Sequence, residues 1–581
     1  MPLLSSLALL VALTGDPPIG ASVGDLRFVD TRYLERSLSD FGTPKATVLV
    51  FTTVACPLVQ RYLPRLGELE RRLRARGVQF VAVNVGPGDQ LIDVARQGVE
   101  SEVEFPFVKD FEGALVAALG VERTPEVVVL DAARTLRYRG RIDAQYRVGG
   151  ANPTPGRGDL ELAIEDVLAG RPVALSETAV DGCVIEPLPA PAPRTDLTWS
   201  REIAALVQRA CQDCHHEGSV APFALVAHRD VARRAAMVAE VVRLGRMPPW
   251  FAAPGVGELE NAPRITEEER EMLVGWVLAG APEGDPARAP RERVFERSTW
   301  RIGEPDLVIR QGVASKVPAD GYVPYQYVIL PHVFLDDTWV EAVEVRPENA
   351  RVVHHANLAH VRLTEQFETR NFITGFVPGG DPLECDPGTA VLIPKGSLLA
   401  LQVHVVTTGR EETSTLSVAL RFPRTTVERR LRHEQIHNSR FEIPPLAPAH
   451  PVRAKRVLEH DSTGIGMFVH MHLRGRDMAF RATYPDGRAE SLLLVPNFNF
   501  DWQQSYRWAP GSRHFPAGTR IDVLAHFDNS RFNPYNPDPT ASVRFGQQTE
   551  DEMMYGFLFY TEDQERLGLR VDAQSGRVLE R

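Results

Sequence analysis

The chain has 581 residues, of which 43% are hydrophobic and 24% are charged, a composition typical of a globular protein with several domains. Its formal net charge is −11, and it has no long basic run that could neutralise phosphates, which argues against nucleic acid as a partner. Small molecules or proteins are the expected partners. The five cysteines are too few to hold a chain of this length together by disulfides.

The N-terminus has features of an export signal. An apolar stretch from Leu3 to Leu13 ends at the breakers Gly15-Asp16-Pro17-Pro18. Its length suits the core of a signal peptide and is too short to span a bilayer. We therefore predict a signal peptide over residues 1–22 and a periplasmic or secreted location in a bacterium. No other apolar run reaches the ~20 residues of a membrane helix, so no transmembrane span is expected.

Residues 23–190 alternate hydrophobic strand patterns with helical patterns, which predicts an α/β domain around a central sheet. Cys56 follows the strand pattern ATVLVFTT and opens a helix, where amide dipoles favour a thiolate. Thr124-Pro125 precedes the strand pattern EVVVLD. In these features the region resembles the thioredoxin-like redoxin family. The resemblance implies a cis Pro125 that faces Cys56.

The region departs from that family in its second cysteine. Val59 stands where a Cys-x-x-Cys site has its second thiol. Thr53-x-x-Cys56 is similar to peroxiredoxins, but Leu49 replaces their proline. Cys183 is either a distant redox partner or a buried structural cysteine. Both a working redox thiol at Cys56 and a degenerate or docking domain remain open.

After a Pro/Ala-rich linker at residues 187–196, helical patterns fill residues 197–288 and predict a small all-α domain. It contains Cys211-x-x-Cys214-His215, where two thiols can bond to a haem and the histidine can ligate its iron. Met247, in the extended sequence RMPPW, suits the opposite axial position. The domain resembles a class I-type small cytochrome c with one covalently bound haem c. A zinc-like or chance cysteine pair is the alternative.

From residue 300 onward, short alternating apolar runs separated by turn residues predict antiparallel β-sandwiches, over residues 300–430 and 431–581. Most of the 16 histidines lie here. His470 and His472 are two apart on a strand pattern, so they share a face and can bind one ion. His404 ends another apolar strand pattern. The adjacent pair His354-His355 can converge on one ion only at a strand end or a bulge.

In combination these motifs resemble the copper type II, ascorbate-dependent monooxygenases, the family of peptidylglycine hydroxylating and dopamine β-monooxygenases. They are the His-His pair, LQVH ending in His404, His-x-His, and Asp-Glu-Met ending in Met553. The resemblance covers residues 300–565 and implies two jelly-roll-like domains that bind two copper ions. It places one copper, for electron storage, on His354, His355 and His404. The second, catalytic copper, where O2 reacts with a substrate C–H, would be held by His470, His472 and Met553.

Some positions differ from the peptide-amidating enzyme. Phe468 replaces its carboxylate-binding arginine, and Tyr555 and Phe557 follow the Asp-Glu-Met motif. These changes favour an aromatic or otherwise apolar substrate over a glycine-extended peptide. Met554, beside Met553, remains an alternative ligand.

The sequence thus predicts a multidomain, exported oxidoreductase. The main hypothesis is a copper-dependent monooxygenase that hydroxylates an sp3 C–H of a small organic substrate with O2. The fused haem would supply its electrons, with or without an external donor such as an ascorbate-like reductant or a redox protein. The alternatives are a non-catalytic electron-transfer or copper-handling protein, and a thiol peroxidase or thiol-disulfide reductase that acts through Cys56.

Overall fold

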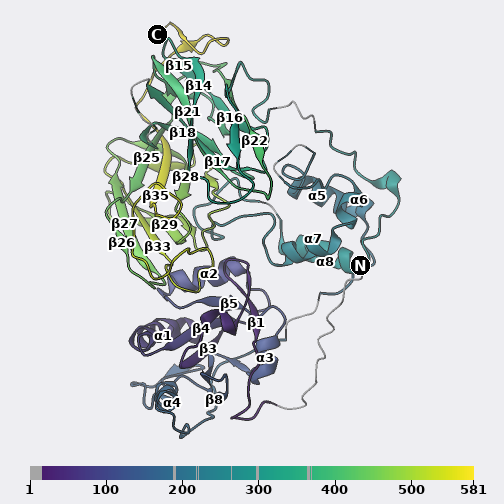
Figure 1. The fold of residues 1–581 in the computed structure, drawn as a ribbon, viewed down its shortest axis with the longest axis vertical. Coiled ribbons are helices and arrows are strands. Elements are labelled where there is room, and N and C mark those ends of the chain that lie inside the picture. The colour runs from purple at the N-terminus through teal and green to yellow at the C-terminus, as the bar shows by residue number, and fades with distance from the viewer. Residues whose placement is uncertain are drawn as a thin grey trace. The chain divides into compact units, whose positions relative to one another are not determined.

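The computed structural model describes residues 16–187, 191–217, 219, 221–263, 265–295, 300–362, 365, 367 and 369–580. The chain forms two compact units, residues 1–190 and 191–581 (Figure 1). Residues 1–15 of the predicted signal peptide lie outside the described residues. Within the described part of the chain, the helices are too short or too polar to cross a bilayer.

The first unit is an α/β domain built on a seven-stranded sheet of order β2-β1-β5-β4-β3-β7-β8. Its strands are β1 (Arg27–Asp30), β2 (Glu35–Ser37), β3 (Ala46–Thr52), β4 (Val78–Asn84), β5 (Phe107–Lys109), β7 (Glu126–Asp131) and β8 (Leu136–Gly140). β3, β4 and β5 are parallel, and β7 runs antiparallel to β3. The predicted α/β layer fold is confirmed for this unit.

Helices cover the sheet of the first unit. They are α1 (Pro57–Arg74), α2 (Leu91–Glu100), α3 (Ala114–Leu119) and α4 (Asp159–Leu168), with the 3-10 turn η1 (Leu38–Phe41). Alternate residues of β3, Val48 and Val50, pack with Leu66 of α1 and Ile164 of α4 in one core. α1 and α4 therefore cover the same face of the sheet, as Figure 1 also shows.

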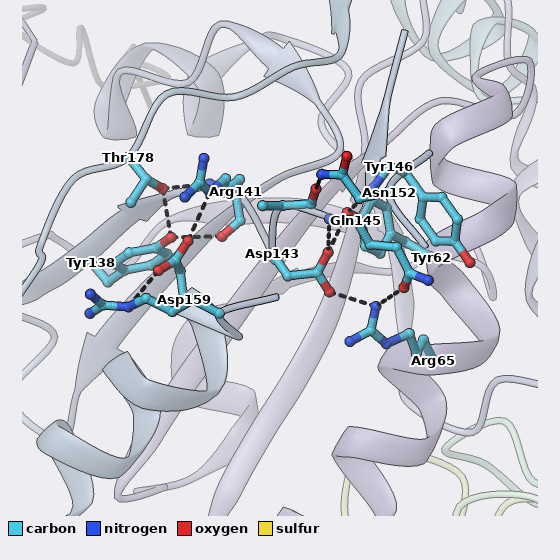
Figure 2. A network of polar contacts seen from close by, with 12 residues as sticks. Tyr62, Arg65, Tyr138, Arg141, Asp143, Gln145, Tyr146, Asn152, Asp159 and Thr178 are labelled. Carbon is cyan, nitrogen blue, oxygen red and sulfur yellow. Dashed lines mark hydrogen bonds and ion pairs between the residues drawn. The ribbon is translucent and has the colours of Figure 1, made fainter. Parts of the chain in front are cut away.

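A polar network fastens the segment after β8 to α1 (Figure 2). The buried Asp143 accepts a hydrogen bond from the Tyr62 hydroxyl at 2.7 Å and pairs with Arg65 at 2.6 Å. Farther along, the Thr178 hydroxyl is 2.7 Å from the Tyr138 hydroxyl. A buried carboxylate is stable only with such partners, so the network fixes the path of this segment over α1. Short pairs complete the unit: β9 (Tyr146–Arg147) with β10 (Gly150–Ala151), and β6 (Arg123–Thr124) with β11 (Cys183–Val184).

The second unit begins with short helices. They are the π-helix η2 (Trp199–Ile203), α5 (Ala204–Ala210), α6 (His228–Ala232), α7 (Ala235–Arg243), α8 (Glu267–Leu278) and the 3-10 turn η3 (Pro286–Arg288). Thr266 caps α8 by accepting a hydrogen bond from the Glu269 amide. The continuous helical pattern of residues 229–245 is interrupted between α6 and α7, where Arg234 leaves the helical backbone conformation. An all-α cytochrome c domain is not evident in this fold and stays a prediction.

The rest of the second unit is mostly antiparallel β-sheet, as predicted. The strands up to residue 430 are β12 (Leu307–Arg310), β13 (Ser315–Val317), β14 (Gln326–Val333), β15 (Thr338–Val340), β16 (Ala342–Pro347), β17 (Val353–Arg362), β18 (Phe372–Phe376), β19 (Leu383–Glu384), β20 (Thr389–Ile393), β21 (Ser397–Val405), β22 (Glu412–Ser414), β23 (Leu416–Arg421) and β24 (Arg429–Arg430), with the 3-10 turn η4 (Thr369–Asn371). Sheet β14-β21-β17-β18 shares one hydrophobic core with sheet β12-β23-β16-β19. Two sheets therefore pack face to face in this part of the chain, whose strands β12 to β24 are the first set of sheets.

A second set of sheets begins after Leu431. β24, before this residue, pairs with β20 of the first set, whereas β25, after it, pairs with β35 near the C-terminus. The later strands are β25 (Arg432–His437), β26 (Glu442–Ile443), β27 (His450–Val457), β28 (Ser462–His470), β29 (Gly475–Thr483), β30 (Ala489–Val495), β31 (Ser505–Arg507), β32 (Arg513–Phe515), β33 (Arg520–Phe527), β34 (Val543–Arg544), β35 (Tyr555–Glu562), β36 (Arg570–Val571) and β37 (Val578–Glu580). The main sheets are β25-β35-β28-β31 and β27-β33-β29-β30. Phe480 of β29 packs closely on Gly556 of β35. A Cβ added to Gly556 would lie 2.6 Å from the Phe480 ring.

Candidate functional sites

Cys56 lies at the N-cap of α1, directly before Pro57 at the first helical position. β3 ends at Thr52, so the sequence prediction of a cysteine between a strand and a helix is confirmed. Its Sγ donates a hydrogen bond to the carbonyl oxygen of Thr124 at 3.4 Å. The Thr124-Pro125 peptide bond is cis, as the family resemblance implied. Cys56 itself is 2% exposed.

Cys183 lies against Cys56 although it is far away in sequence. β11 runs antiparallel to β6, and Cys183 pairs with Thr124 in that register. The two Sγ atoms are 3.2 Å apart, a contact between free thiols rather than a disulfide. Of the two alternatives for Cys183, the geometry therefore favours the distant redox partner.

Gly182 permits this approach. A Cβ at this position would lie 2.4 Å from the Thr124 carbonyl oxygen, which is closer than any side chain can come to backbone. Arg123 holds the same turn by donating a hydrogen bond from Nη1 to the Gly182 carbonyl at 2.8 Å. A residue without a side chain is thus required one position before Cys183.

The two thiols differ in acidity. Burial raises the pKa of Cys56, but hydrogen bonds, first among them those from the Val59 amide and the Cys183 thiol, together lower it by more, so its pKa lies below the ordinary value. Burial and the neighbouring Cys56 raise the pKa of Cys183 to about 11. Cys56 is therefore the more acidic thiol of the pair, and once it has lost its proton the neutral Cys183 thiol can donate a hydrogen bond to it.

His354, His355 and His404 come together at one point of the first set of sheets. Each offers a ligand atom, and these atoms all lie within 4.8 Å of one another. His355 pairs directly with His404 across β17 and β21, and the register shifts between Val353 and His355. This irregularity is the bulge that the sequence required if adjacent histidines were to reach one ion.

The nitrogen atoms of these histidines suit a metal. Nδ1 of His354 and Nδ1 of His404 are buried and have no hydrogen-bond partner in the described part of the chain. Burial lowers the pKa of His404 to about 4 and that of His355 well below its ordinary value. The imidazoles of His355 and His404 are therefore neutral at pH 7 and have lone pairs to donate. Three imidazoles are a donor set that fits copper.

The second predicted copper group also comes together, with one correction. β28 ends at His470, so His472 is not on the strand and the predicted shared strand face is wrong. The chain turns after the strand, and the two rings still lie 5.2 Å apart between centroids. Met553 lines the same cavity as His470, whereas Met554 is not among the residues that line it.

Backbone contacts hold His472 in this turn. Glu552 is buried and accepts hydrogen bonds from the amides of His472 at 2.9 Å and Arg474 at 2.6 Å. The His472 Nδ1 donates to the Asp551 carbonyl at 3.1 Å, which leaves Nε2 buried without a partner in the described residues. Burial lowers the pKa of His472 to about 3. The Asp-Glu-Met segment thus supports His472 as well as supplying Met553.

The predicted haem residues follow α5. Cys211 caps its C-terminus, and Cys214 and His215 lie in the turn after it, where both cysteines are free thiols. The His215 Nδ1 donates to the Phe223 carbonyl at 3.1 Å, which leaves Nε2 for a ligand bond. Met247 follows α7, where its amide donates to the Val241 carbonyl. The cysteine pair and the tautomer of His215 fit a covalent haem, and Met247 as the axial ligand stays a prediction.

The segment after Met247 packs on the β-sheet region. The Pro249 carbonyl accepts a hydrogen bond from Gln504 Nε2 at 2.8 Å. The ring of Trp250 lies edge-on to Tyr506, with 5.2 Å between centroids. Asn261 exchanges two hydrogen bonds with β31, to the Ser505 carbonyl and from the Arg507 amide, each at 2.9 Å. The predicted haem-ligand loop is therefore joined to the second set of sheets.

Comparison with known proteins assigns part of the chain. Residues 19–139 match the AhpC/TSA family. They form a thioredoxin-like redoxin domain. Similar solved structures include an uncharacterized conserved protein from Geobacillus kaustophilus, which is 26% identical in sequence. The match covers 30% of this chain and 94% of that chain, and its TM-score is 0.28. A putative thiol:disulfide interchange protein DsbE from Chlorobium tepidum has 20% identity, covers 26% of this chain and 98% of its own, and has a TM-score of 0.22. A search of curated proteins found no match.

In the redoxin domain, sequence reasoning missed Gly182 and the Thr124 carbonyl as parts of the site. A glycine directly before Cys183 was the available signal, but its meaning depends on a neighbour that is remote in sequence. In the β-sheet region it missed Tyr325, whose hydroxyl is 3.4 Å from Nε2 of His355. It also missed Asp501 and Gln503, which touch His354 and His470.

Proposed function

We propose that the redoxin domain is a thiol-dependent oxidoreductase in which Cys56 is the nucleophile and Cys183 the resolving thiol. The contact of 3.2 Å between their Sγ atoms carries this proposal. A Cys-x-x-Cys redoxin has its second thiol one helical turn after the first. This chain supplies it from β11 instead, next to the cis Pro125.

The reaction follows from the unequal acidity of the thiols. With a disulfide substrate, the Cys56 thiolate attacks one sulfur and releases the other as a thiolate, which takes up a proton. Cys183 then loses its proton and attacks Cys56 Sγ, which releases the second substrate thiol and leaves a Cys56–Cys183 disulfide. With a hydroperoxide, Cys56 becomes a sulfenic acid, the substrate leaves as an alcohol, and Cys183 displaces water. In both cases the two thiols give up two electrons.

Reduced full-length protein mixed with a small disulfide or with hydrogen peroxide tests this function. We expect one equivalent of oxidant to be consumed per chain, with formation of an intramolecular disulfide. Cys56→Ser should abolish consumption, and Cys183→Ser should leave a mixed disulfide or a sulfenic acid on Cys56. Cys385→Ser is the matched control, because that thiol is half-buried in the β-sheet region, elsewhere in the chain. Equal consumption by wild type and Cys56→Ser would refute the proposal.

We further propose that the β-sheet region is a copper-dependent monooxygenase. The convergence of His354, His355 and His404 within 4.8 Å at a strand bulge is the observation that favours it. His470, His472 and Met553 would hold the second copper. Bound copper would supply the one-electron chemistry that activates O2. The chain's own part is to keep the imidazoles of His355, His404 and His472 neutral, so that their lone pairs are available at pH 7.

A cavity of about 240 Å³ beside His470 and Met553 suits a small substrate. Phe372, Phe468 and Phe557 line it, and Phe557 packs against the other two rings at 5.5 and 5.8 Å. Its polar lining has Arg370, His437 and Tyr555 together with four side-chain amides: Asn357, Gln402, Gln435 and Gln547. The phenylalanine rings support an aromatic or otherwise apolar substrate, hydroxylated at an sp3 carbon next to Met553.

Electrons for this reaction would enter through a covalent haem held by Cys211, Cys214 and His215. The hydrogen bond between Gln504 and Pro249 supports that route, because it joins the predicted axial-ligand loop to the β-sheet region. An ascorbate-like reductant or a redox protein would then reduce the haem or the copper from outside. Covalent haem attachment would also support the proposed export to the periplasm or beyond.

Metal analysis and O2 uptake test the second proposal. We expect two coppers and one haem per full-length chain, and O2 uptake that depends on an aromatic amine or small amide substrate. Met553→Ile should abolish turnover and leave copper at the three-histidine group. Met478→Ile, in the core of β29, is the control. Copper and haem without O2 uptake would instead support the electron-transfer or copper-handling alternative, and zinc or no metal would refute copper binding.

A further inference from the structure

A single segment, Asn499–Gln503, lies between the two histidine groups. The ring of Phe500 stacks on His354, with 5.3 Å between centroids and 20° between planes. The same ring is 6.0 Å from His404 and 6.1 Å from His472. One side chain from the second set of sheets therefore contacts histidines of both groups.

Polar side chains on either side of Phe500 contact one histidine of each group. Asp501 Oδ1 is 3.0 Å from Nε2 of His354. Gln503 Oε1 is 2.7 Å from Nδ1 of His470. A carboxylate or an amide oxygen can only accept, so both ring nitrogens carry protons. The lone pair of His354 is then on Nδ1, and that of His470 is on Nε2.

The segment is itself held in shape. Asn499 Oδ1 accepts a hydrogen bond from the Asp501 amide at 2.8 Å, which forms a local turn. Gln503 Nε2 donates to the Phe500 carbonyl at 3.2 Å, and Gln503 is 4% exposed. The Gln503 amide is therefore fixed in the orientation that presents its oxygen to His470.

We propose that Asn499–Gln503 is a shared positioning segment for both copper groups, in which Asp501 orients His354 and Gln503 orients His470. The inference rests on the proposed copper function and adds residues outside the ligand sets. Partners of the second ring nitrogen fix the tautomer and rotation of a ligating histidine, and their loss typically weakens metal binding by about 10–100-fold. The Asp501 side chain is 59% exposed, so its pair with His354 adds little to folding stability.

Copper titrations on the full-length chain can test each contact separately. In a His472→Ala background, which retains the three-histidine group, Asp501→Ala should weaken Cu(II) binding about 10–100-fold and change the Cu(II) EPR spectrum. In a His404→Ala background, which retains the other group, Asp501→Ala should change neither. Asp486→Asn, at an exposed hairpin turn of the same region, is the control and should behave like the background variant.

The reverse pattern is expected for Gln503. Gln503→Leu should weaken copper binding about 10–100-fold in the His404→Ala background and leave it unchanged in the His472→Ala background. Gln503→Glu keeps an acceptor oxygen and should restore binding, whereas a folding defect would not be rescued selectively. Unchanged affinities and spectra in the Asp501→Ala and Gln503→Leu variants would overturn the positioning role while copper binding stands. A wild-type chain that binds no copper would refute the proposed copper function itself.

Discussion

The Sγ atoms of Cys56 and Cys183 lie 3.2 Å apart although 127 positions separate the two residues in sequence. β6 and β11 bring them together, because Cys183 pairs with Thr124 and the Cys56 Sγ lies 3.4 Å from the carbonyl oxygen of the same residue. A redoxin domain without a Cys-x-x-Cys motif thus has a second thiol in contact with the first. The contact also affects their acidity, since a hydrogen bond donated by the Cys183 thiol favours the ionised form of Cys56.

Removing that donor should make Cys56 less acidic. The Cys183 thiol is one of the groups that lower the pKa of Cys56, so the pKa should rise in Cys183→Ala. The midpoint pH for alkylation of Cys56 by iodoacetamide, followed by mass spectrometry of its peptide, should shift upward from the wild-type value. Cys385→Ala should leave the midpoint unchanged. An unchanged or lower midpoint in Cys183→Ala would show that Cys183 does not stabilise the thiolate.

A methyl group at Gly182 should separate the two thiols. The Cβ of Gly182→Ala would lie 2.4 Å from the Thr124 carbonyl oxygen, so β11 must move away from β6. We expect a loss of about 1–3 kcal/mol in stability and a much slower formation of the Cys56–Cys183 disulfide under mild oxidant. Thiol trapping followed by gel electrophoresis measures the rate. Gly24→Ala is the control, because nothing lies within 4 Å of its Cβ, and equal rates for both variants would contradict the steric argument.

Local sequence patterns predicted several features of the thiol site and of the histidine groups. Cys56 at the start of a helix followed from the strand-then-helix pattern, and the bulge at His354 followed from the alternation of side chains on a strand. The order of the histidine motifs placed the ligands of each group together. These residues lie together as predicted because each prediction depends on residues close in sequence or on a known combination of motifs, whereas copper binding stays a prediction.

Contacts between remote segments could not be predicted in this way. Nothing in the sequence around Asp501 indicates that it reaches His354, because that contact depends on how the two sets of sheets pack. The end of β28 at His470 was also missed, since the apolar alternation continues past it. There the turn at His472 is fixed by its amide bond to Glu552, which is remote in sequence. Tertiary hydrogen bonds overrode the local pattern.

Each histidine group should lose its own copper when one ligand is removed. His404→Ala removes an imidazole from the three-histidine group, and His472→Ala removes one from the other group. We expect each variant to bind one copper per chain instead of two, as measured by metal analysis after dialysis. His460→Ala, an exposed histidine on the same set of sheets as His472, should retain both. Loss of both coppers from a single variant would show that the groups do not bind independently.

The paired thiols after α5 should hold haem covalently if His215 is its ligand. His215 directly follows the turn from Cys211 to Cys214, and its Nδ1 is already bonded to the Phe223 carbonyl, which leaves Nε2 for a ligand bond. Expressed with a haem-attachment system, the wild-type chain should retain haem on a denaturing gel, as peroxidase staining detects. Cys211→Ala/Cys214→Ala should lose the stain, whereas Cys385→Ala should keep it. Zinc bound in place of haem, with the stain absent from the wild type, would contradict the cytochrome assignment and remove the proposed electron route through Gln504.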